Sequence, residues 1–293
     1  MRVLVTGATG FVGSHLLPAL VAEGHDIFAA VRDPGRLEPT SGITPVECDL
    51  ATSSEGRPLP EVEAIVHLAQ ANVRFPEGAG ELYRVNTTST QELLDHGRRT
   101  GARRFVLTSS GSVYGFGPKP FAESDPVHPH DFYALTKIHS EQLVASYGEH
   151  FGTTVLRLFA PYGPGQAGRL IPSLAQRVRR GDAVTLNGGG QPRMNPIYID
   201  DLVSVLLASL GRDGHETVNV GGGEAVGVGE LASRIAEAIG TEARFEEGTA
   251  EGPGDLVGDT TLLHELYAPA GLVPLDEGLR RTAASLTAEE VSA

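Results

Sequence analysis

The stretch VTGATGFVG, residues 5–13, decides the fold of this chain. A short apolar run precedes it, three glycines follow in it, and helical spacing begins at Phe11. Gly7 permits a tight turn, Gly10 lets the backbone approach a ligand, and Gly13 lets the helix lie close to the strand. A strand, a glycine turn and a helix start in this order present backbone N–H groups to a diphosphate. The stretch therefore predicts a dinucleotide-binding βαβ unit, with a purely structural turn as the alternative.

Strand and helix patterns alternate through the first half of the chain. Strand-like runs lie at residues 2–5, 26–31, 44–47, 64–68, 104–108 and 154–159, and helical spacing is clearest at 11–23, 80–100 and 132–148. Alternating strands and helices with right-handed crossovers form a parallel sheet covered by helices on both faces. We therefore expect a Rossmann-type, doubly wound α/β domain over residues 1–160, with a return segment near 195–220.

The regular alternation ends near Pro161, where the chain becomes richer in glycine and proline. Shorter elements follow, including a strand expected at Pro196–Ile199 and a helix at 229–239. A basic run at 177–180 is expected at a helix end, where cations favour the helix dipole. We expect residues 161–293 to form mainly a small C-terminal α/β substrate-binding lobe.

The composition limits the partners of this chain. Its 293 residues carry a formal net charge of −14, which argues against nucleic acid or an anionic membrane as a partner. The single cysteine, Cys48, excludes an internal disulfide and suits a reducing compartment. No run approaches the ~20 apolar residues that span a bilayer, and no charged-then-apolar leader precedes the first strand. We expect a cytoplasmic protein that acts on a small molecule. No metal is expected, because the histidines, including His128 and His130, lack a ligand spacing.

Tyr133 and Lys137, in the stretch YALTK, are separated by one helical turn, so both side chains project from the same face. A phenol has a reference pKa of about 10, which is high for proton exchange at neutral pH. An ammonium group nearby favours the phenolate and lowers that pKa. The pair therefore suits general acid–base catalysis on an alcohol or ketone. An amphipathic helix also produces this spacing without any catalytic role, which is the structural alternative.

A hydroxyl-rich run, TSSGSVYG at residues 108–115, ends the strand expected at 104–108. At the carboxyl end of a parallel strand, such hydroxyls face the ligand crevice and can donate to a substrate oxygen. A polar strand-to-loop junction that makes local turns is the alternative. The glycine turn, the serine run and the Tyr/Lys pair occur in one order along the chain, and together they favour an active site.

These motifs resemble those of the extended short-chain dehydrogenase/reductase family, which includes nucleotide-sugar epimerases, dehydratases and ketoreductases. The resemblance covers nearly the whole chain and includes TGATGFVG, ECDL, HLA, VNT, TSSGSVYG, YALTK, RLFAPYGPG, RMNPIYIDDL and VNVGGGE. It implies that Ser110 is the catalytic hydroxyl and that Tyr133 transfers the proton. By the same resemblance, Lys137 holds the nicotinamide ribose and lowers the pKa of the tyrosine.

The resemblance also implies a set of cofactor-binding residues along the first domain. Asp49 and Leu50 would meet the adenine. Leu68, Ala69 and Asn86 would line the cofactor cleft. Together with the glycine turn and Arg32, which are inferred from the residues themselves, the candidate cofactor-binding set is Gly7, Gly10, Phe11, Val12, Gly13, Arg32, Asp49, Leu50, Leu68, Ala69, Asn86, Tyr133 and Lys137. A turn-capping role for Asp49 and a helix-anchoring role for Asn86 are the alternatives.

The end of the second strand departs from the family pattern. Val31 stands about where members that use NAD carry an acid for the ribose hydroxyls, and Arg32 follows it. A guanidinium group suits a 2′-phosphate by bidentate pairing. A solvent-facing Arg32, with Asp33 near the ribose, is the alternative. We expect NADP in preference to NAD.

The substrate-binding candidates are Ser112, Ala160 and Arg193. Ser112 follows Gly111 where dehydratases of the family place an acidic pair, so dehydration is not expected. Ala160 replaces an asparagine that often contacts the substrate in the family. Arg193 matches an arginine that commonly reaches a nucleotide diphosphate.

Two further features bear on the substrate. A salt bridge of Arg193 to Asp200 or Asp201 is the structural alternative to diphosphate binding. A second arginine found in the family before the final helices is absent, because residues 251–259 read EGPGDLVGD.

Two enzyme functions follow. The main hypothesis is hydride transfer at a carbinol or ketone carbon of a nucleotide sugar by an NAD(P)-dependent 4-epimerase or 4-ketoreductase. The alternative is an NADPH-dependent ketoreductase of a non-sugar carbonyl compound, and a non-catalytic cofactor-sensing protein is the remote one. Family members often pair through the helices at 80–100 and 132–148, so we expect a homodimer.

Overall fold

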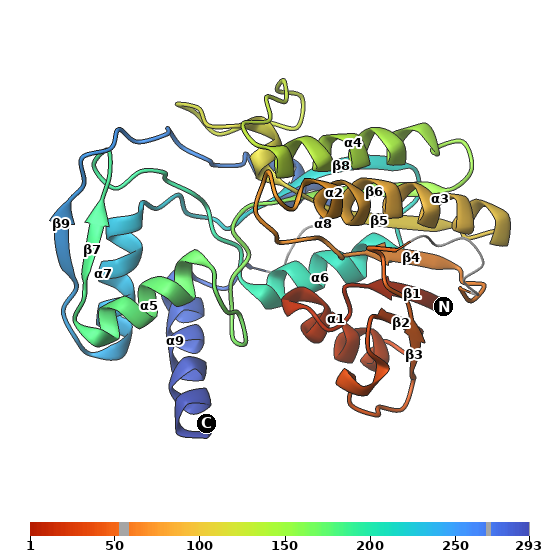
Figure 1. Ribbon diagram of the computed structural model, residues 1–293, viewed down its shortest axis with the longest axis horizontal. Helices are drawn as coiled ribbons and strands as arrows, with labels where there is room; N and C mark the ends of the chain where they lie inside the picture. Colours follow the sequence, from red (N-terminus) through yellow and green to blue (C-terminus); the bar gives the residue numbers. More distant parts are fainter. Residues whose placement is uncertain (53–58, 268–270, 293) are drawn as a thin grey trace. The chain divides into compact units, whose positions relative to one another are not determined.

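The computed structural model describes residues 1–52, 59–267 and 271–292, and the chain divides into two compact units (Figure 1). The first unit comprises residues 1–113, 126–157 and 203–218. The second comprises residues 114–125, 158–202 and 219–293.

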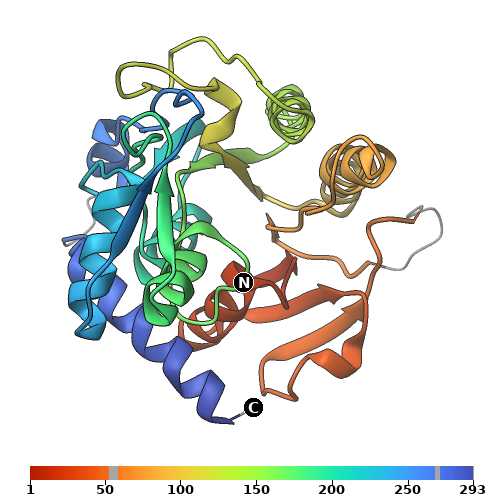
Figure 2. The same ribbon diagram turned by 60° about the vertical axis from the view of Figure 1, so that its left-hand side comes forward.

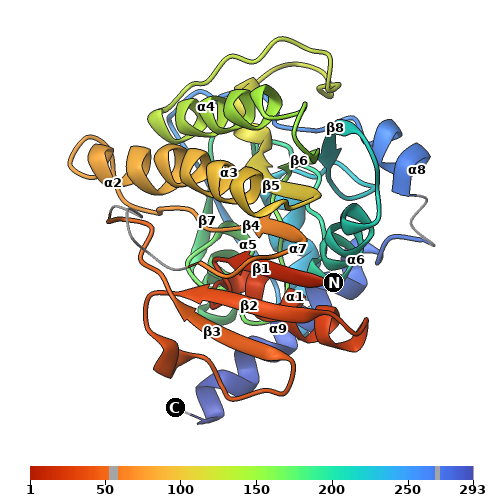
Figure 3. The same cartoon turned by 90° about the vertical axis from the view of Figure 1, so that its right-hand side faces the viewer.

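A seven-stranded sheet with the strand order β3-β2-β1-β4-β5-β6-β8 forms the centre of the first unit, and Figure 3 shows its first strands side by side. β1 pairs in parallel with both β2 and β4, and β4 pairs in parallel with β5. The strands are β1 (Arg2–Thr6), β2 (Asp26–Val31), β3 (Ile43–Glu47), β4 (Ala64–His67), β5 (Arg104–Ser110), β6 (Gly152–Leu158) and β8 (His215–Val220).

The strand order reverses beside β1, because the chain moves outward through β2 and β3 and then returns to β4 on the other side of β1. Right-handed crossovers in opposite directions place their helices on opposite faces of a sheet. A crevice forms at such a reversal, beyond the carboxyl ends of the strands, and ligands bind there in open α/β sheets. The topology therefore points to the ends of β1 and β4 as the ligand site.

Helices connect these strands. Figure 2 shows α3 and α4 nearly end on and side by side, and they pack against β4 and β5 respectively. The helical elements are α1 (Phe11–Ala22), η1 (Pro34–Arg36), α2 (Ala79–Tyr83), η2 (Arg84–Thr88), α3 (Ser89–Thr100), η3 (Gly111–Tyr114), α4 (Phe132–Ser146) and α6 (Ile199–Leu210). Among all the residues that the structure describes, no helix is both long enough and apolar enough to cross a membrane.

Most expected elements are confirmed, with two instructive differences. The helix expected at 80–100 contains a π-helical turn, η2, between α2 and α3. The strand expected at Pro196–Ile199 was wrong, because Tyr198 makes only an isolated bridge to Tyr162 and α6 begins at Ile199. Pro196 has no N–H to donate to a strand ladder, which disfavours a strand there.

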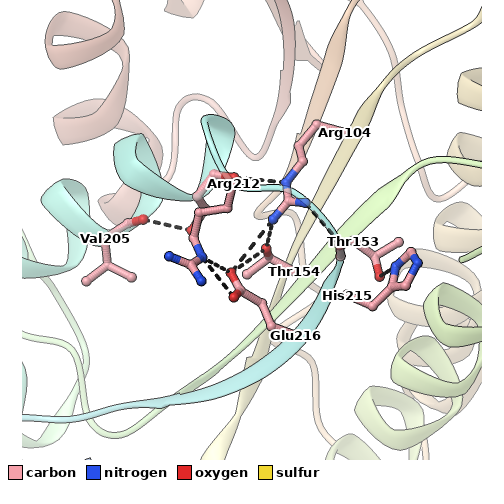
Figure 4. Close-up of polar contacts among 9 residues, drawn as sticks. Arg104, Thr153, Thr154, Val205, Arg212, His215 and Glu216 are labelled. Carbon is pink, nitrogen blue, oxygen red and sulfur yellow. Dashed lines mark hydrogen bonds and ion pairs between the residues drawn. The ribbon is translucent and has the colours of Figure 1, made fainter. Parts of the chain in front are cut away.

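A polar network ties the strand ends opposite the ligand edge of the first unit (Figure 4). The Arg104 side chain is 3% exposed, and its guanidinium donates to the carbonyls of Ser209 at 2.9 Å and Gly214 at 3.1 Å. Glu216 lies 3.7 Å from Arg104 and accepts from Arg212 at 2.8 Å. Since each buried charge has partners, the network holds the segment 203–218 against β5 and β6 without an uncompensated charge.

The second unit contains the remaining elements. Two parallel strands, β7 and β9, form a small sheet, and α7 packs against both α5 and α9. Their bounds are α5 (Leu170–Arg180), β7 (Ala183–Leu186), α7 (Val228–Ile239), β9 (Arg244–Glu247), α8 (Thr261–Tyr267) and α9 (Leu275–Ser292). The basic run at 177–180 lies in the last turn of α5, as expected.

Candidate active site

The glycine turn lies between β1 and α1, against the chain that leaves β4. Gly7 has a φ of +68°, which favours glycine, and a Cβ there would lie 2.8 Å from the backbone nitrogen of Ala69. A Cβ on Gly13 would clash with the carbonyl oxygens of Gly7 and Ala8. The first turn of α1 therefore lies against the glycine turn, which only glycine permits at these positions.

The amino terminus of α1 is open to a ligand. Gly10 is its N-cap and no side chain caps the helix among the described residues. Phe11, Val12 and Gly13 form the first turn, whose N–H groups have no carbonyl partner one turn earlier. Those N–H groups and the helix dipole suit an anion. A dinucleotide diphosphate fits this cradle, because the missing side chains leave room for close backbone approach.

Tyr133 and Lys137 lie on α4, which begins after Asp131. The Asp131 carboxylate accepts from the backbone N–H of Ala134 at 2.7 Å and so caps the helix. The Lys137 ammonium lies 5.8 Å from the centre of the Tyr133 ring. The Tyr133 hydroxyl donates to Oε1 of Gln70 at 2.6 Å. The expected spacing thus brings the phenol and the ammonium together.

Lys137 is almost fully buried, with 2% of its surface exposed. Its ammonium donates to the carbonyl of Thr108 at 2.9 Å, which ties α4 to the end of β5 two residues before Ser110. Burial lowers the pKa of Lys137 to about 8, while Glu141 acts in the opposite direction. A buried ammonium of this kind loses its proton more readily than the ammonium of an exposed lysine does.

His67, at the end of β4, is a neutral part of the same interior. Burial, together with the charge of Lys137, lowers the pKa of His67 to about 3. Its Nδ1 lies 2.7 Å from the hydroxyl of Thr6, and its Nε2 lies 3.1 Å from the hydroxyl of Thr90. A neutral ring between two hydroxyls adds no second positive charge beside Lys137.

Ser110 is the last residue of β5, and Ser112 belongs to the helical turn η3 that follows. Their hydroxyl oxygens lie 2.8 Å apart, and the N–H of Ser112 donates to the Ser110 hydroxyl at 3.2 Å. Ser110 is therefore held at the carboxyl edge of the sheet, where a hydroxyl faces the ligand crevice. Gly111, between them, carries no acid.

Asn86 lies in the π-helical turn η2, and only 2% of its surface is exposed. Its Oδ1 accepts from the N–H of Ala71 at 2.9 Å, and its Nδ2 donates to Thr136 at 3.0 Å. The side chain therefore links the loop after β4 to α4. This is the anchoring alternative described above. The π-helical turn, which often marks functional sites, was not visible in the sequence.

Four further candidates lie along the same edge of the sheet. Leu68 is buried, and Ala69 donates its N–H to the Thr6 hydroxyl at 3.2 Å. The Asp49 carboxylate accepts from the N–H of Ala51 at 3.0 Å, and Leu50 packs into the core. Asp49 thus makes the turn-capping contact two residues after the end of β3.

Arg32 follows β2, and its side chain is exposed. Val31, before it, is buried with 4% of its surface exposed. The Asp33 carboxylate accepts from the N–H of Gly35 at 2.9 Å and caps η1. Arg32 is therefore the charged group that β2 presents to solvent at this position.

Glu141 is a residue near the site that the sequence analysis missed. It lies one turn beyond Lys137 on α4, so the spacing already carried the signal. Its carboxylate accepts from Arg157 at 2.7 Å and from Ser109 at 2.5 Å. The ion pair with Arg157 joins α4 to β6 and the hydrogen bond from Ser109 joins α4 to β5, so both contacts support the position of the helix.

The two remaining substrate candidates lie in the second unit. Ala160 has a φ of +44°, a conformation that asparagine adopts more readily than alanine. Arg193 is exposed and donates to the carbonyl of Ala225 at 2.7 Å. Within the described residues, no ion pair joins Arg193 to Asp200 or Asp201, so the guanidinium keeps no carboxylate partner there.

Comparisons with known proteins agree with this arrangement. The model of the NAD dependent epimerase/dehydratase family matches residues 3–221. The chain is 30% identical to a dTDP-4-dehydro-6-deoxy-D-allose reductase of Streptomyces bikiniensis, over 96% of this chain and 94% of the relative. It is also 30% identical to YtcB of Bacillus subtilis, described as an uncharacterized UDP-glucose epimerase, over 98% of both chains.

A solved structure gives the same result. MoeE5 in complex with UDP-glucuronic acid and NAD superposes with a TM-score of 0.87 at 29% identity, covering 99% of this chain and 100% of MoeE5. The fold and the site thus define a Rossmann-type enzyme of the short-chain dehydrogenase/reductase type. The chain belongs to the NAD-dependent epimerase/dehydratase family.

Proposed function

We propose that this protein is an NAD(P)-dependent 4-epimerase or 4-ketoreductase of a nucleotide sugar. The observation that carries the proposal is the Tyr133–Lys137 pair, held on α4 by the bond from Lys137 to the Thr108 carbonyl. The names of the Streptomyces and Bacillus relatives, and the ligands of MoeE5, support a nucleotide sugar as substrate.

The proposed chemistry divides between cofactor and protein. The dinucleotide, when bound, supplies the acceptor or donor of hydride for the substrate carbon. The amino terminus of α1 binds its diphosphate, and Lys137 orients its ribose. Ser110 donates a hydrogen bond to the substrate oxygen. As a phenolate, Tyr133 accepts the proton of the substrate hydroxyl during oxidation, and as a neutral phenol it returns that proton to the substrate oxygen during reduction.

A ketoreductase of a non-sugar carbonyl compound is the second candidate. Ala160 keeps a backbone conformation that favours asparagine, yet lacks the amide that would contact a sugar. The absence of a second arginine in residues 251–259 points the same way.

Mass spectrometry of the dinucleotide released on denaturation tests the choice between these functions. An epimerase returns the hydride it removes and gains from retaining its cofactor, whereas a reductase exchanges its cofactor in every cycle. For an epimerase we expect a retained dinucleotide together with interconversion of UDP-hexoses at C4, and retained NAD in place of NADP would contradict the cofactor preference proposed from Arg32. A cofactor-free protein that oxidises NADPH only with non-sugar ketones would overturn the nucleotide-sugar proposal.

Arg32 provides a test of the cofactor preference. We propose that NADP is preferred over NAD, although MoeE5 is solved with NAD. Arg32→Ala is expected to weaken NADPH binding relative to NADH by a factor of about 10 to 100, because a charge-assisted hydrogen bond contributes about 1.5–3 kcal/mol. Isothermal titration with both cofactors measures this ratio, and Arg99→Ala, on α3, is the control. An unchanged ratio in Arg32→Ala would remove the basis for an NADP preference.

A homodimer through α3 and α4 and a cytoplasmic location complete the proposal. Light scattering of the purified protein tests the dimer, with a monomer at micromolar concentration as the contradicting result.

A further inference from the structure

Gln70 contacts the proposed proton-transfer group directly. It is the residue after Ala69, where the chain leaves β4, and its Oε1 accepts from the Tyr133 hydroxyl at 2.6 Å. We propose that Gln70 is a positioning residue that holds the Tyr133 hydroxyl in both of its protonation states. This inference rests on the proposed function, because it assigns Gln70 a part in the proton transfer by Tyr133.

The backbone on both sides of Gln70 is fixed. Ala69 donates its N–H to the buried hydroxyl of Thr6 at 3.2 Å, and Ala71 donates its N–H to Asn86 at 2.9 Å. Ala71 is also buried, with 5% of its surface exposed, in a small apolar cluster that includes the Tyr133 ring. The backbone of Gln70 is therefore held beside the cluster against which the Tyr133 ring packs, while the Gln70 side chain and its hydrogen bond to Tyr133 are exposed to solvent. A glutamine on a loop without these two backbone hydrogen bonds would not be held in a fixed position relative to Tyr133.

The chemistry of a primary amide matches both states of a phenol. Its oxygen accepts a hydrogen bond and its NH₂ group donates two. The amide oxygen of Gln70 meets the neutral Tyr133 hydroxyl, as seen here. A half-turn about the last side-chain bond presents the NH₂ group to a phenolate instead. A carboxylate at this position accepts from the phenol but repels the phenolate.

The charged groups around Tyr133 do not hold its hydroxyl in both protonation states, so we assign this role to the amide of Gln70. Lys137 lies on the same helix face and favours the phenolate. Burial keeps His67 neutral, and Arg84 pairs with Glu92 at 2.8 Å. The titratable and charged groups on the elements packed around Tyr133 are His67, Arg74, Glu77, Glu81, Tyr83, Arg84, Asp131, Lys137, His139 and Glu141. Gln70 adds a contact that Lys137 does not make, because it acts on the hydroxyl in its neutral state as well.

The test compares Gln70→Glu and Gln70→Ala with the wild type. The near-ultraviolet absorbance of tyrosinate is titrated against pH, with Tyr133→Phe in each background subtracted to isolate Tyr133. Gln70→Glu is expected to leave about tenfold less Tyr133 phenolate at a given pH, because a nearby like charge raises the pKa of an acid. Gln142→Ala, at an exposed position of α4, is the control and is expected to leave the Tyr133 titration unchanged.

Turnover provides the second measurement. In Gln70→Glu, the pH range over which the rate of substrate oxidation increases is expected to shift to higher pH. The shift is expected to equal that of the Tyr133 titration, while KM changes little. Gln70→Ala is expected to lower kcat and to move the titration less than the glutamate does. The absorbance titration needs no substrate, so it distinguishes a failure of this inference from a failure of the proposed function. A Tyr133 titration that is the same in Gln70→Glu and wild type would overturn the inference, and so would a loss of thermal stability alone.

Discussion

Replacing Tyr133 by phenylalanine is expected to lower turnover by a factor of about 10²–10⁴, the usual contribution of general acid–base catalysis. The substitution removes only the hydroxyl oxygen. The ring keeps its packing against the cluster of Ala71, Leu82 and Val85, so the fold and cofactor binding are expected to persist. Steady-state kinetics with a nucleotide sugar, together with dinucleotide affinity, measure the two effects separately.

Tyr147→Phe is the matched control for this experiment. Tyr147 follows α4 and donates its hydroxyl to Asp95 at 2.8 Å, away from the glycine turn. It therefore loses one hydrogen bond with no proposed catalytic role, and its turnover is expected to match that of the wild type. Turnover of Tyr133→Phe within about threefold of the wild type would refute Tyr133 as the proton-transfer residue.

The fold could be predicted because its signals are local. The glycine turn at 5–13 and the alternation of strand and helix patterns each depend on neighbouring residues in the chain. The prediction of a strand at Pro196–Ile199 was wrong. Its four residues are apolar or aromatic and match a strand pattern, but Pro196 lacks the N–H that ladder pairing needs. The strand propensity of a few residues does not indicate whether a partner strand lies beside them in the fold.

The candidate site could be predicted in part for the same reason. Tyr133 and Lys137 share a helix, so their proximity follows from spacing alone. The contact from Tyr133 to Gln70 joins residues 63 positions apart, and the anchoring of Asn86 to Thr136 joins residues 50 apart. Such contacts depend on which strands lie side by side, and no local pattern in the sequence encodes them. Glu141 is the intermediate case, since its spacing was visible but its partners on β5 and β6 were not.

Lys137→Met is expected to abolish turnover and yet to stabilise the cofactor-free protein at pH 7. The chain has only two lysines, and Lys137 is the buried one. Burial lowers its pKa from 10.5 to about 8, so the unfolded chain binds this proton more tightly than the folded protein does. At about 1.4 kcal/mol per tenfold difference, the buried charge costs about 3 kcal/mol below pH 8. Loss of the bond to the Thr108 carbonyl offsets about 1 kcal/mol, which leaves a net gain of about 2 kcal/mol in Lys137→Met.

The sign of the pH dependence makes this prediction specific. As the pH rises from about 8 towards 10.5, the wild-type protein loses the buried charge and gains stability, because over this range the unfolded chain binds more protons. Lys137→Met has no such proton, so its advantage at pH 7 is expected to vanish near pH 10. Urea unfolding of both proteins at the two pH values measures this difference. Lys119, the other lysine, is exposed and lies 3.7 Å from Asp125, so Lys119→Met is expected to show neither the gain nor the pH dependence. A destabilised Lys137→Met, or an advantage that persists at pH 10, would mean that the protein does not hold Lys137 as a costly buried charge. The proposed catalytic pair would then not trade stability for reactivity.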